Sequence, residues 1–307
     1  MLLVEPREIK LTTRSEIAVR RTIPHAKLRR VGAWVFLDHF GPTPQVDGMT
    51  VAAHPHTGLQ TVTWLFEGQV HHRDSIGSSQ LIRPGQLNLM TAGTGVAHSE
   101  KARVAAEVSN LHAVQLWVAL PNSASNQPAS FEHLNELPQF EAHNLTGTVF
   151  IGEFGGATSA ARVYSPLVGA QLDVAGDASI ELRPDWEYAI LPVVGGVVAR
   201  NAESETLEAA ETELLYLPTG TRELHLEPVG GKPSNLLLIG GEPFDEEIIM
   251  WWNFIERTPE AIAAKREQWN ARETHPVEGF EVFEDEIGGW IPAPDLPNVT
   301  LRPRGRS

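Results

Sequence analysis

Two short segments of this chain each place two metal-competent side chains two residues apart. The first segment holds His54 and His56, and the second, further along the chain, holds His98 and Glu100. Side chains two residues apart on a β-strand point to the same face of the strand. Two such strands inside a barrel would therefore direct three imidazoles and one carboxylate at a single point. This donor set suits a divalent first-row metal ion such as iron, copper, zinc or nickel.

A single His-x-His pair also has a simpler explanation, because such pairs occur in solvated loops that bind nothing. Two ligand pairs that flank a region of short strands and turns favour a metal site over this explanation. An octahedral ion held by four protein ligands would keep two coordination positions for a substrate or for dioxygen.

The order and spacing of the motifs around these pairs resemble those of the pirin family, a member of the cupin superfamily. The resemblance is strong over residues 30–121 and weaker over much of the remaining chain. It rests on these segments, in this order: Leu37-Asp38-His39-Phe40-Gly41-Pro42, His54-Pro55-His56-Thr57-Gly58, Leu65-Phe66-Glu67-Gly68, His72-Arg73-Asp74-Ser75, Arg83-Pro84-Gly85, Met90 to Glu100, and Leu116 to Pro121.

The resemblance implies an all-β bicupin fold with two jelly-roll barrels. We expect the two barrels to lie face to face and C-terminal helices to pack on the barrels. It also implies one iron ion in the N-terminal barrel. The positions that match the family's ligands are His54, His56, His98 and Glu100. We therefore expect Fe(II) as the cofactor, with zinc, nickel, manganese or copper as substitutes.

One position departs from the pattern of the family. Gln60 stands where cupins and many pirins carry a glutamate after the His-x-His pair. An amide is a poor metal ligand, but the carboxylate ligand of pirins is the later one, which is Glu100 here. We therefore expect the metal site to be intact and its surroundings to be altered.

The resemblance also implies quercetin 2,3-dioxygenase activity, because pirins resemble the cupin dioxygenases that cleave flavonols. The 3-hydroxyl group of the substrate would lose its proton to Glu100, which makes this residue the candidate catalytic base. Dioxygen would then add, the heterocycle would open and carbon monoxide would leave. The expected partners are a small flavonol-like aromatic substrate and dioxygen.

A second class of function stays open, because pirins are also known as nuclear or transcription-linked proteins. Such a protein would be a non-enzymatic regulator, with the oxidation state of iron as its switch and a protein as its partner. A purely structural bicupin is a weaker third alternative, since such a protein need not retain all four ligands. Dioxygen uptake with a panel of flavonols, on protein of known metal content, would separate these alternatives.

The composition limits the class of protein. The chain has 307 residues, 42% of them apolar, which is enough for two domains with buried cores. It has no cysteine, which excludes disulfides, thiolate ligands and a thiol nucleophile. The net charge of −15 argues against nucleic acid as a partner. No apolar run reaches the roughly 18 residues of a membrane span, and no secretory signal is visible, so we expect a cytoplasmic protein without membrane contact.

Glycine and proline separate short apolar runs through most of the chain, which is typical of an all-β protein. We predict an N-terminal cupin barrel with the metal site at residues 1–121, a connection at 122–143 and a degenerate second barrel at 144–245. The second barrel has no His-x-His pair, and its histidine is the isolated His225, so we expect no metal there.

Residues 246–307 are predicted to form C-terminal helices and an extended tail. The segment from Asp245 to Glu256 carries apolar residues at helical spacing. A further helix is expected to begin after Thr258, with Thr258 as its N-cap and Pro259 at its first position.

Other side chains near the predicted site have plainer explanations. His71 and His72 are adjacent on a predicted strand, so at most one of them points into the barrel. His112 directly precedes a strand and is interpreted as structural. Gln115 and Trp117 share one strand face, which could either line the barrel or belong to its ordinary core.

Overall fold

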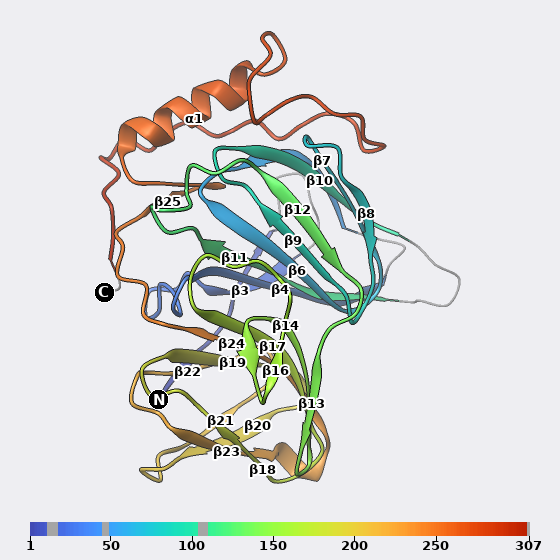
Figure 1. Ribbon diagram of the computed structural model, residues 1–307, viewed down its shortest axis with the longest axis vertical. Helices are drawn as coiled ribbons and strands as arrows, with labels where there is room; N and C mark the ends of the chain where they lie inside the picture. The colour runs from blue at the N-terminus through green and yellow to red at the C-terminus, as the bar shows by residue number, and fades with distance from the viewer. Residues whose placement is uncertain (11–17, 45–48, 104–109, 306–307) are drawn as a thin grey trace. The chain divides into compact units, whose positions relative to one another are not determined.

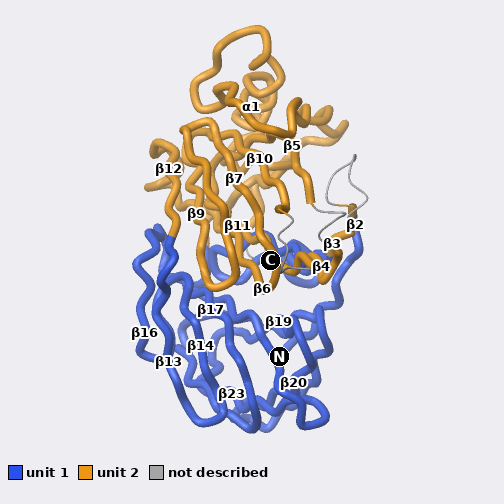
Figure 2. The backbone as a smooth tube through the Cα atoms, turned by 90° about the vertical axis from the view of Figure 1, so that its right-hand side faces the viewer, with its two compact units in different colours: residues 1–9, 20–39, 134–244 blue, residues 10–19, 40–133, 245–307 orange. Residues whose placement is uncertain are grey.

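The computed structural model describes residues 1–10, 18–44, 49–103 and 110–305. Its contacts divide the chain into two compact units, which Figure 2 draws in two colours. Unit 1 holds Met1–Ile9, Arg20–His39 and Leu134–Phe244. Unit 2 holds the described residues of Lys10–Val19, Phe40–His133 and Asp245–Ser307.

The strands of the first half of the chain form two antiparallel sheets (Figure 1). The four-stranded sheet has the order β5 (Thr50–His56), β10 (Val96–Ala102), β7 (Val70–Asp74) and β8 (Ser79–Ile82). The seven-stranded sheet has the order β12 (Ser130–Leu134), β9 (Leu87–Thr91), β6 (Leu59–Glu67), β11 (Asn110–Ala119), β4 (Trp34–Pro44), β3 (Ala18–Ile23) and β2 (Arg7–Lys10).

The strands of the second half form a second pair of sheets. The four-stranded sheet has the order β18 (Ala178–Glu181), β23 (Glu223–Pro228), β20 (Val197–Asn201) and β21 (Thr206–Ala209). The seven-stranded sheet has the order β1 (Leu2–Val4), β22 (Leu214–Leu217), β19 (Glu187–Val194), β24 (Ser234–Gly241), β17 (Leu167–Val174), β14 (Leu145–Ile151) and β13 (Gln139–Ala142). A short hairpin, β15 (Glu153–Phe154) with β16 (Ala157–Thr158), and the 3₁₀ turn Val229–Gly231 complete this half.

The two pairs of sheets have the same connectivity, strand for strand, as expected for a duplicated jelly roll. The two seven-stranded sheets differ at one edge. There β12 is the edge strand in the sheet of the first half, and β1 is the edge strand at the matching position in the sheet of the second half. Because β1 pairs with β22, the N-terminal strand belongs to the sheet of the second half. The predicted all-β fold with two jelly rolls is confirmed, while the domain boundaries and the face-to-face arrangement stay predictions.

The predicted helix from Asp245 to Glu256 is wrong, because this segment forms a hairpin of β25 (Ile249–Trp251) and β26 (Phe254–Glu256). Except for Met250, its apolar residues are β-branched or aromatic, and such residues favour strands. Trp252 adopts a positive φ of 52° in the turn, and a residue with this backbone conformation interrupts an α-helix. Neighbouring backbone also supplies partners, since the Ile255 amide donates to the Thr57 carbonyl over 3.0 Å.

The helix predicted after Thr258 is confirmed as α1 (Pro259–Ala271), with the Thr258 hydroxyl accepting from the Ala261 amide over 3.2 Å. It is the one α-helix in the part of the chain that the structure describes. No helix among the described residues is long and apolar enough to cross a membrane.

A hydrophobic layer from the C-terminal segment covers the outer face of β5 and β10. Its buried members Ile262, Trp269 and Phe280 form one cluster with Ala53 of β5 and Ala97 of β10. Residues on a strand alternate between its two faces, so the residues next to these alanines face the interior of the sandwich. Those neighbours carry the chemistry described next.

Candidate metal centre

Strands β5, β10 and β7 lie side by side and carry every residue of the candidate site. In the pairing of β5 with β10, His98 lies opposite His54, and a register shift follows between His98 and Glu100. On the other side of β10, Glu100 lies opposite His72. All of these side chains are at most 8% exposed, so the site is buried within the sandwich.

Three histidines converge on one point. Each of His54, His56 and His98 offers one ring nitrogen, and these nitrogens lie within 4.8 Å of one another. The Nε2 atoms of His56 and His98 are 3.1 Å apart. Two nitrogens bound at right angles to one ion at about 2.1 Å would lie about 3 Å apart. The spacing therefore fits a shared divalent cation.

Two of the three histidine rings are also held from their outer sides. The Nδ1 atom of His54 donates to the Ala52 carbonyl oxygen over 3.0 Å. The Nδ1 atom of His98 lies 3.3 Å from Nδ1 of His72. Outer partners of this kind orient metal-binding imidazoles and fix their tautomers.

Burial lowers the pKa of all three histidines. Desolvation takes the pKa of His54 from 6.5 to about 4, and it takes the pKa values of His56 and His98 well below 6.5. Repulsion among the neighbouring histidines lowers them further. The rings are therefore neutral at neutral pH, which is the form that binds a metal ion.

We expect the metal-free protein to lose stability as pH falls below 6.5. An unfolded chain protonates His54 near pH 6.5, whereas the folded chain does so only near pH 4. Unfolding therefore takes up a proton between these values, at about 1.4 kcal/mol per pH unit, or about 3 kcal/mol in all for His54. Urea unfolding of the metal-free protein from pH 7.5 to pH 4 would measure the slope.

The control for this measurement is His54→Gln, which removes the titrating ring and should show a shallower slope. A wild-type unfolding free energy that stays constant between pH 6.5 and pH 4 would contradict the pKa shift of His54.

The carboxylate of Glu100 belongs to a second group of ligand atoms. One of its oxygens lies within 4.8 Å of ring nitrogens of His72 and His98. The Thr63 hydroxyl donates to Oε1 of Glu100 over 3.4 Å, and desolvation raises the pKa of Glu100 above its usual 4.5. His98 is thus common to both groups, and the set of four ligands with Glu100 stays a prediction.

The structure decides between the two adjacent histidines of β7. His72 is 3% exposed and points inward, where its Nε2 lies 3.0 Å from Oδ2 of Asp74. His71 points outward, and its ring contacts Ser79 and Arg103. Burial works to raise the pKa of Asp74, but the hydrogen bonds from His72 and Ser78 together bring it below its usual value.

His72 and Asp74 are residues to which the sequence interpretation gave no role. The signal that could have found them is the spacing of two residues, which also identified His54 with His56 and His98 with Glu100. By contrast, His112 is buried against Phe66, with 5.0 Å between ring centroids, in agreement with a structural role.

Comparison with known proteins identifies the family. The model of the pirin family matches residues 16–118, and that of the pirin C-terminal cupin domain matches residues 167–275. A Pseudomonas aeruginosa protein, provisionally named a quercetin 2,3-dioxygenase, is 42% identical over 286 residues. That match covers 92% of this chain and 86% of the relative. This protein belongs to the pirin family.

Solved structures agree with this assignment. A quercetin 2,3-dioxygenase from Acinetobacter baumannii is 38% identical to this pirin, with a TM-score of 0.87 over 98% of this chain and 97% of that one. A bacterial pirin from Escherichia coli, solved in complex with nickel(II), is 16% identical, with a TM-score of 0.60 over 79% of this chain and 99% of that one. The latter likeness shows the shared fold alone.

The second jelly roll of this pirin has aliphatic residues where the first has its polar site. Ile180 lies opposite Leu224, as His54 lies opposite His98. Leu226 lies opposite Ala199, as Glu100 lies opposite His72. At the positions that match His54, His98, Glu100 and His72, the second jelly roll therefore has buried aliphatic residues, which are Ile180, Leu224, Leu226 and Ala199. Aliphatic side chains at these four positions offer no atom that could bind a metal ion, and the absence of a metal from the second barrel stays a prediction.

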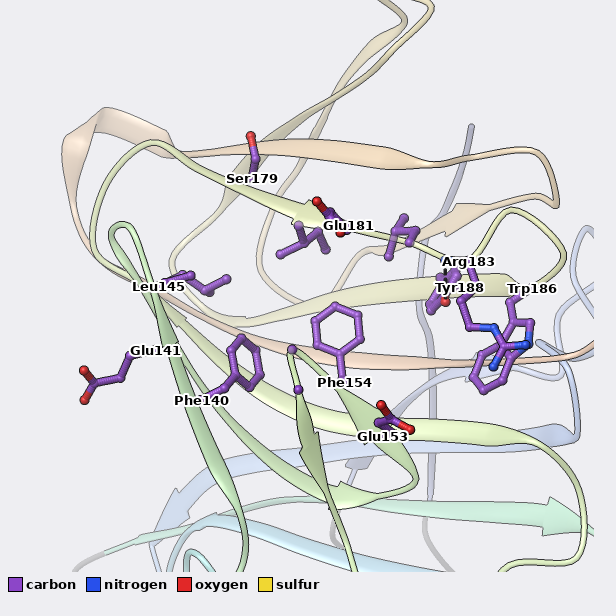
Figure 3. A pocket seen from close by; sticks show the side chains of 15 residues that line it. Phe140, Glu141, Leu145, Glu153, Phe154, Ser179, Glu181, Arg183, Trp186 and Tyr188 are labelled. Atoms are coloured by element: carbon purple, nitrogen blue, oxygen red, sulfur yellow. Dashed lines mark hydrogen bonds between the residues drawn. The ribbon is translucent and has the colours of Figure 1, made fainter.

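The second half instead holds a cavity of about 560 Å³ (Figure 3). Phe140 and Phe154 contact each other at 5.7 Å between ring centroids, and the Arg183 guanidinium lies 4.4 Å from the Trp186 ring centroid. Both clusters of metal-competent side chains found among the described residues lie elsewhere, on β5, β7 and β10. The candidate metal ligands among the described residues therefore lie in the first jelly roll.

Proposed function

We propose that this pirin is a metal-dependent dioxygenase that cleaves flavonols such as quercetin. The observation that carries the proposal is the convergence of His54, His56 and His98, with the carboxylate of Glu100 beside them on β10. The similarity to proteins named as quercetin 2,3-dioxygenases supports the same reaction. The proposed metal ligands are these three histidines and Glu100.

The donor set fits a first-row divalent ion, and Fe(II) is the metal that we propose. Three neutral imidazoles and one carboxylate suit iron, and the same donors accept zinc, nickel, manganese or copper as substitutes. When bound, the ion would act as a Lewis acid on a substrate oxygen and take part in the reduction of dioxygen.

Glu100 is the proposed proton acceptor for the substrate hydroxyl group. Desolvation raises the pKa of Glu100, so its carboxylate is a stronger base than an exposed glutamate. The Thr63 hydroxyl donates to Oε1 and thereby orients the carboxylate. The buried ring of Trp117 stands edge-on to His56, with 5.1 Å between ring centroids, and covers that side of the site.

A row of polar side chains crosses the seven-stranded sheet next to Glu100 and is the proposed contact surface for the substrate. Gln115 lies opposite Thr63, and Thr63 lies opposite Asn88, so the three side chains are neighbours on one face. The Nε2 of Gln115 and the Nδ2 of Asn88 are buried donors without a hydrogen-bond partner among the described residues. Such donors suit the oxygens of a polyhydroxylated ligand.

Replacement of Gln115 is expected to weaken substrate binding more than catalysis. Gln115→Leu removes a hydrogen-bond donor at similar volume, and one such bond is worth about 1.4 kcal/mol, or about tenfold in KM. Steady-state dioxygen uptake at several quercetin concentrations would separate KM from kcat. Gln139→Leu, on β13 of the second half, is the control. An unchanged KM in Gln115→Leu would exclude this contact.

The proposed reaction is tested by dioxygen uptake on protein of measured iron content. Quercetin should consume dioxygen and release carbon monoxide, whereas luteolin, which lacks the 3-hydroxyl group, should not react. Fully loaded protein that turns over no flavonol would contradict the activity and favour an iron-dependent regulator that binds a protein partner. A cytoplasmic location and the absence of nucleic acid and membrane partners remain part of the proposal.

A further inference from the structure

His98, His72 and Asp74 form a chain of three buried side chains. The chain starts at Nδ1 of His98, on the other side of the ring from the Nε2 that faces His56. Nδ1 of His98 lies 3.3 Å from Nδ1 of His72, and Nε2 of His72 lies 3.0 Å from Oδ2 of Asp74. All three residues are at most 3% exposed. The ring of Phe131 stacks on His72 at 4.6 Å between centroids and 21° between planes, which fixes the plane of that ring.

The order of donors along this chain follows from its last member. A carboxylate accepts hydrogen bonds and cannot donate them, so Nε2 of His72 must carry the proton that faces Asp74. Nδ1 of His72 is then an acceptor, and it receives the N–H of Nδ1 of His98. Nε2 of His98 is consequently without a proton, and its lone pair is directed to the point that it shares with His56.

Asp74 is fixed in its role by the turn that follows β7. Its other oxygen, Oδ1, accepts from the backbone amides of Ile76 over 3.1 Å and of Ser78 over 2.8 Å. Oδ2 is therefore the atom directed at His72. Whereas His54 is held through a backbone carbonyl group, His98 is held through two side chains that mutation can change.

The second jelly roll provides an internal comparison. Asp74 lies opposite His98 in the ladder of β7 and β10, and Asn201 lies opposite Leu224 at the matching position. His72 corresponds to Ala199 in the same way. The half of the molecule that has aliphatic residues at the ligand positions therefore also lacks both outer residues.

We propose that His72 and Asp74 are positioning residues that set the tautomer of His98 so that its Nε2 can bind the metal ion. The proposal rests on the metal site of the proposed function and does not depend on its substrate. It assigns to His72 the place of an outer partner, although its ring also lies near Glu100. It predicts that the charge of Asp74 acts on metal affinity through His72.

The decisive variant is Asp74→Asn. The new amide oxygen can still accept from Ile76 and Ser78, so its NH₂ group must face Nε2 of His72. His72 then becomes an acceptor there and a donor at Nδ1, which forces the proton of His98 onto Nε2. Loss of an outer partner costs about 10- to 100-fold in metal affinity, and we expect a loss in this range.

Two readouts are needed, and neither requires turnover. Competition with a chelator of known affinity gives the dissociation constant for Fe(II) or for Zn(II). The ¹⁵N chemical shifts of the metal-free protein give the tautomer of His98 directly. Asp285→Asn is the matched control, because Asp285 also caps backbone amides, those of Ile287 and Gly288, without contacting a histidine.

His72→Phe breaks the chain and keeps the stacking on Phe131. In that background, Asp74→Asn should have no further effect on metal affinity, because the coupling runs through His72. Overturning results are wild-type affinity and an unchanged His98 tautomer in Asp74→Asn, or additive losses in the double variant. Protein that binds metal but cleaves no flavonol would contradict the proposed activity alone. Wild-type protein that binds no divalent metal would overturn both proposals.

Discussion

His56→Ala is expected to abolish stoichiometric metal binding. The Nε2 of His56 is 3.1 Å from that of His98, so removal of the His56 ring takes away one of the three converging ring nitrogens. A four-ligand protein site binds a divalent ion with about 10–16 kcal/mol, so one ligand is worth about 3 kcal/mol, or more than about 100-fold in affinity. Metal content after dialysis, together with chelator competition, measures the loss.

His225→Ala is the control for this prediction. His225 lies on β23 in the second half, between Leu224 and Leu226, so its side chain points to the opposite face from the positions that correspond to His98 and Glu100. It should retain the metal content of the wild type. Full metal occupancy in His56→Ala would contradict the assignment of His56 as a ligand, and it would move the site to the group of His72, His98 and Glu100.

Glu100→Gln is expected to separate metal binding from catalysis. The amide keeps the size of the side chain and one oxygen donor, but it removes the negative charge and the base. General base catalysis contributes about 10²- to 10⁴-fold, so turnover of quercetin should fall by at least about 100-fold at equal iron content. Dioxygen uptake and carbon monoxide release, measured on protein reconstituted to matched iron content across a pH series, test this.

Glu181→Gln serves as the control, since Glu181 is an exposed carboxylate at the end of β18 in the second half. Its turnover should match that of the wild type. Near-normal dioxygen consumption by iron-loaded Glu100→Gln would show that Glu100 acts only as a ligand. The base would then have to be sought among other groups on the same face.

The shared strand face of each candidate ligand pair was predictable because the two-residue period of a strand is a local property. His54 and His56 share a face wherever β5 lies, and the same holds for His98 and Glu100 on β10. The capping of α1 by Thr258 was predictable for the same reason, since a cap involves only the first turn of a helix. The expectation that both pairs meet came from placing the two strands inside one barrel, and the resemblance to a family supported it.

The hairpin of β25 and β26 was not predictable from its apolar spacing. A helix and a strand pair compete for the same backbone groups, and the choice here follows from partners distant in the sequence. The Ile255 amide finds the Thr57 carbonyl, and Gly58 gives the room for this approach, because a Cβ atom there would lie 2.1 Å from the Ile255 carbonyl oxygen. The helical spacing of the apolar residues is thereby overridden by tertiary pairing.

The sequence by itself determined the residue types, their shared strand faces and the absence of thiol chemistry. Only the tertiary structure decided which strands are neighbours, and therefore that His72 rather than His71 points inward and that Asp74 stands behind it. It also placed Glu100 opposite His72 through the pairing of β10 with β7. The physical reason is that a strand's period is set within a few residues, whereas its register is set by hydrogen bonds to strands far away in the chain.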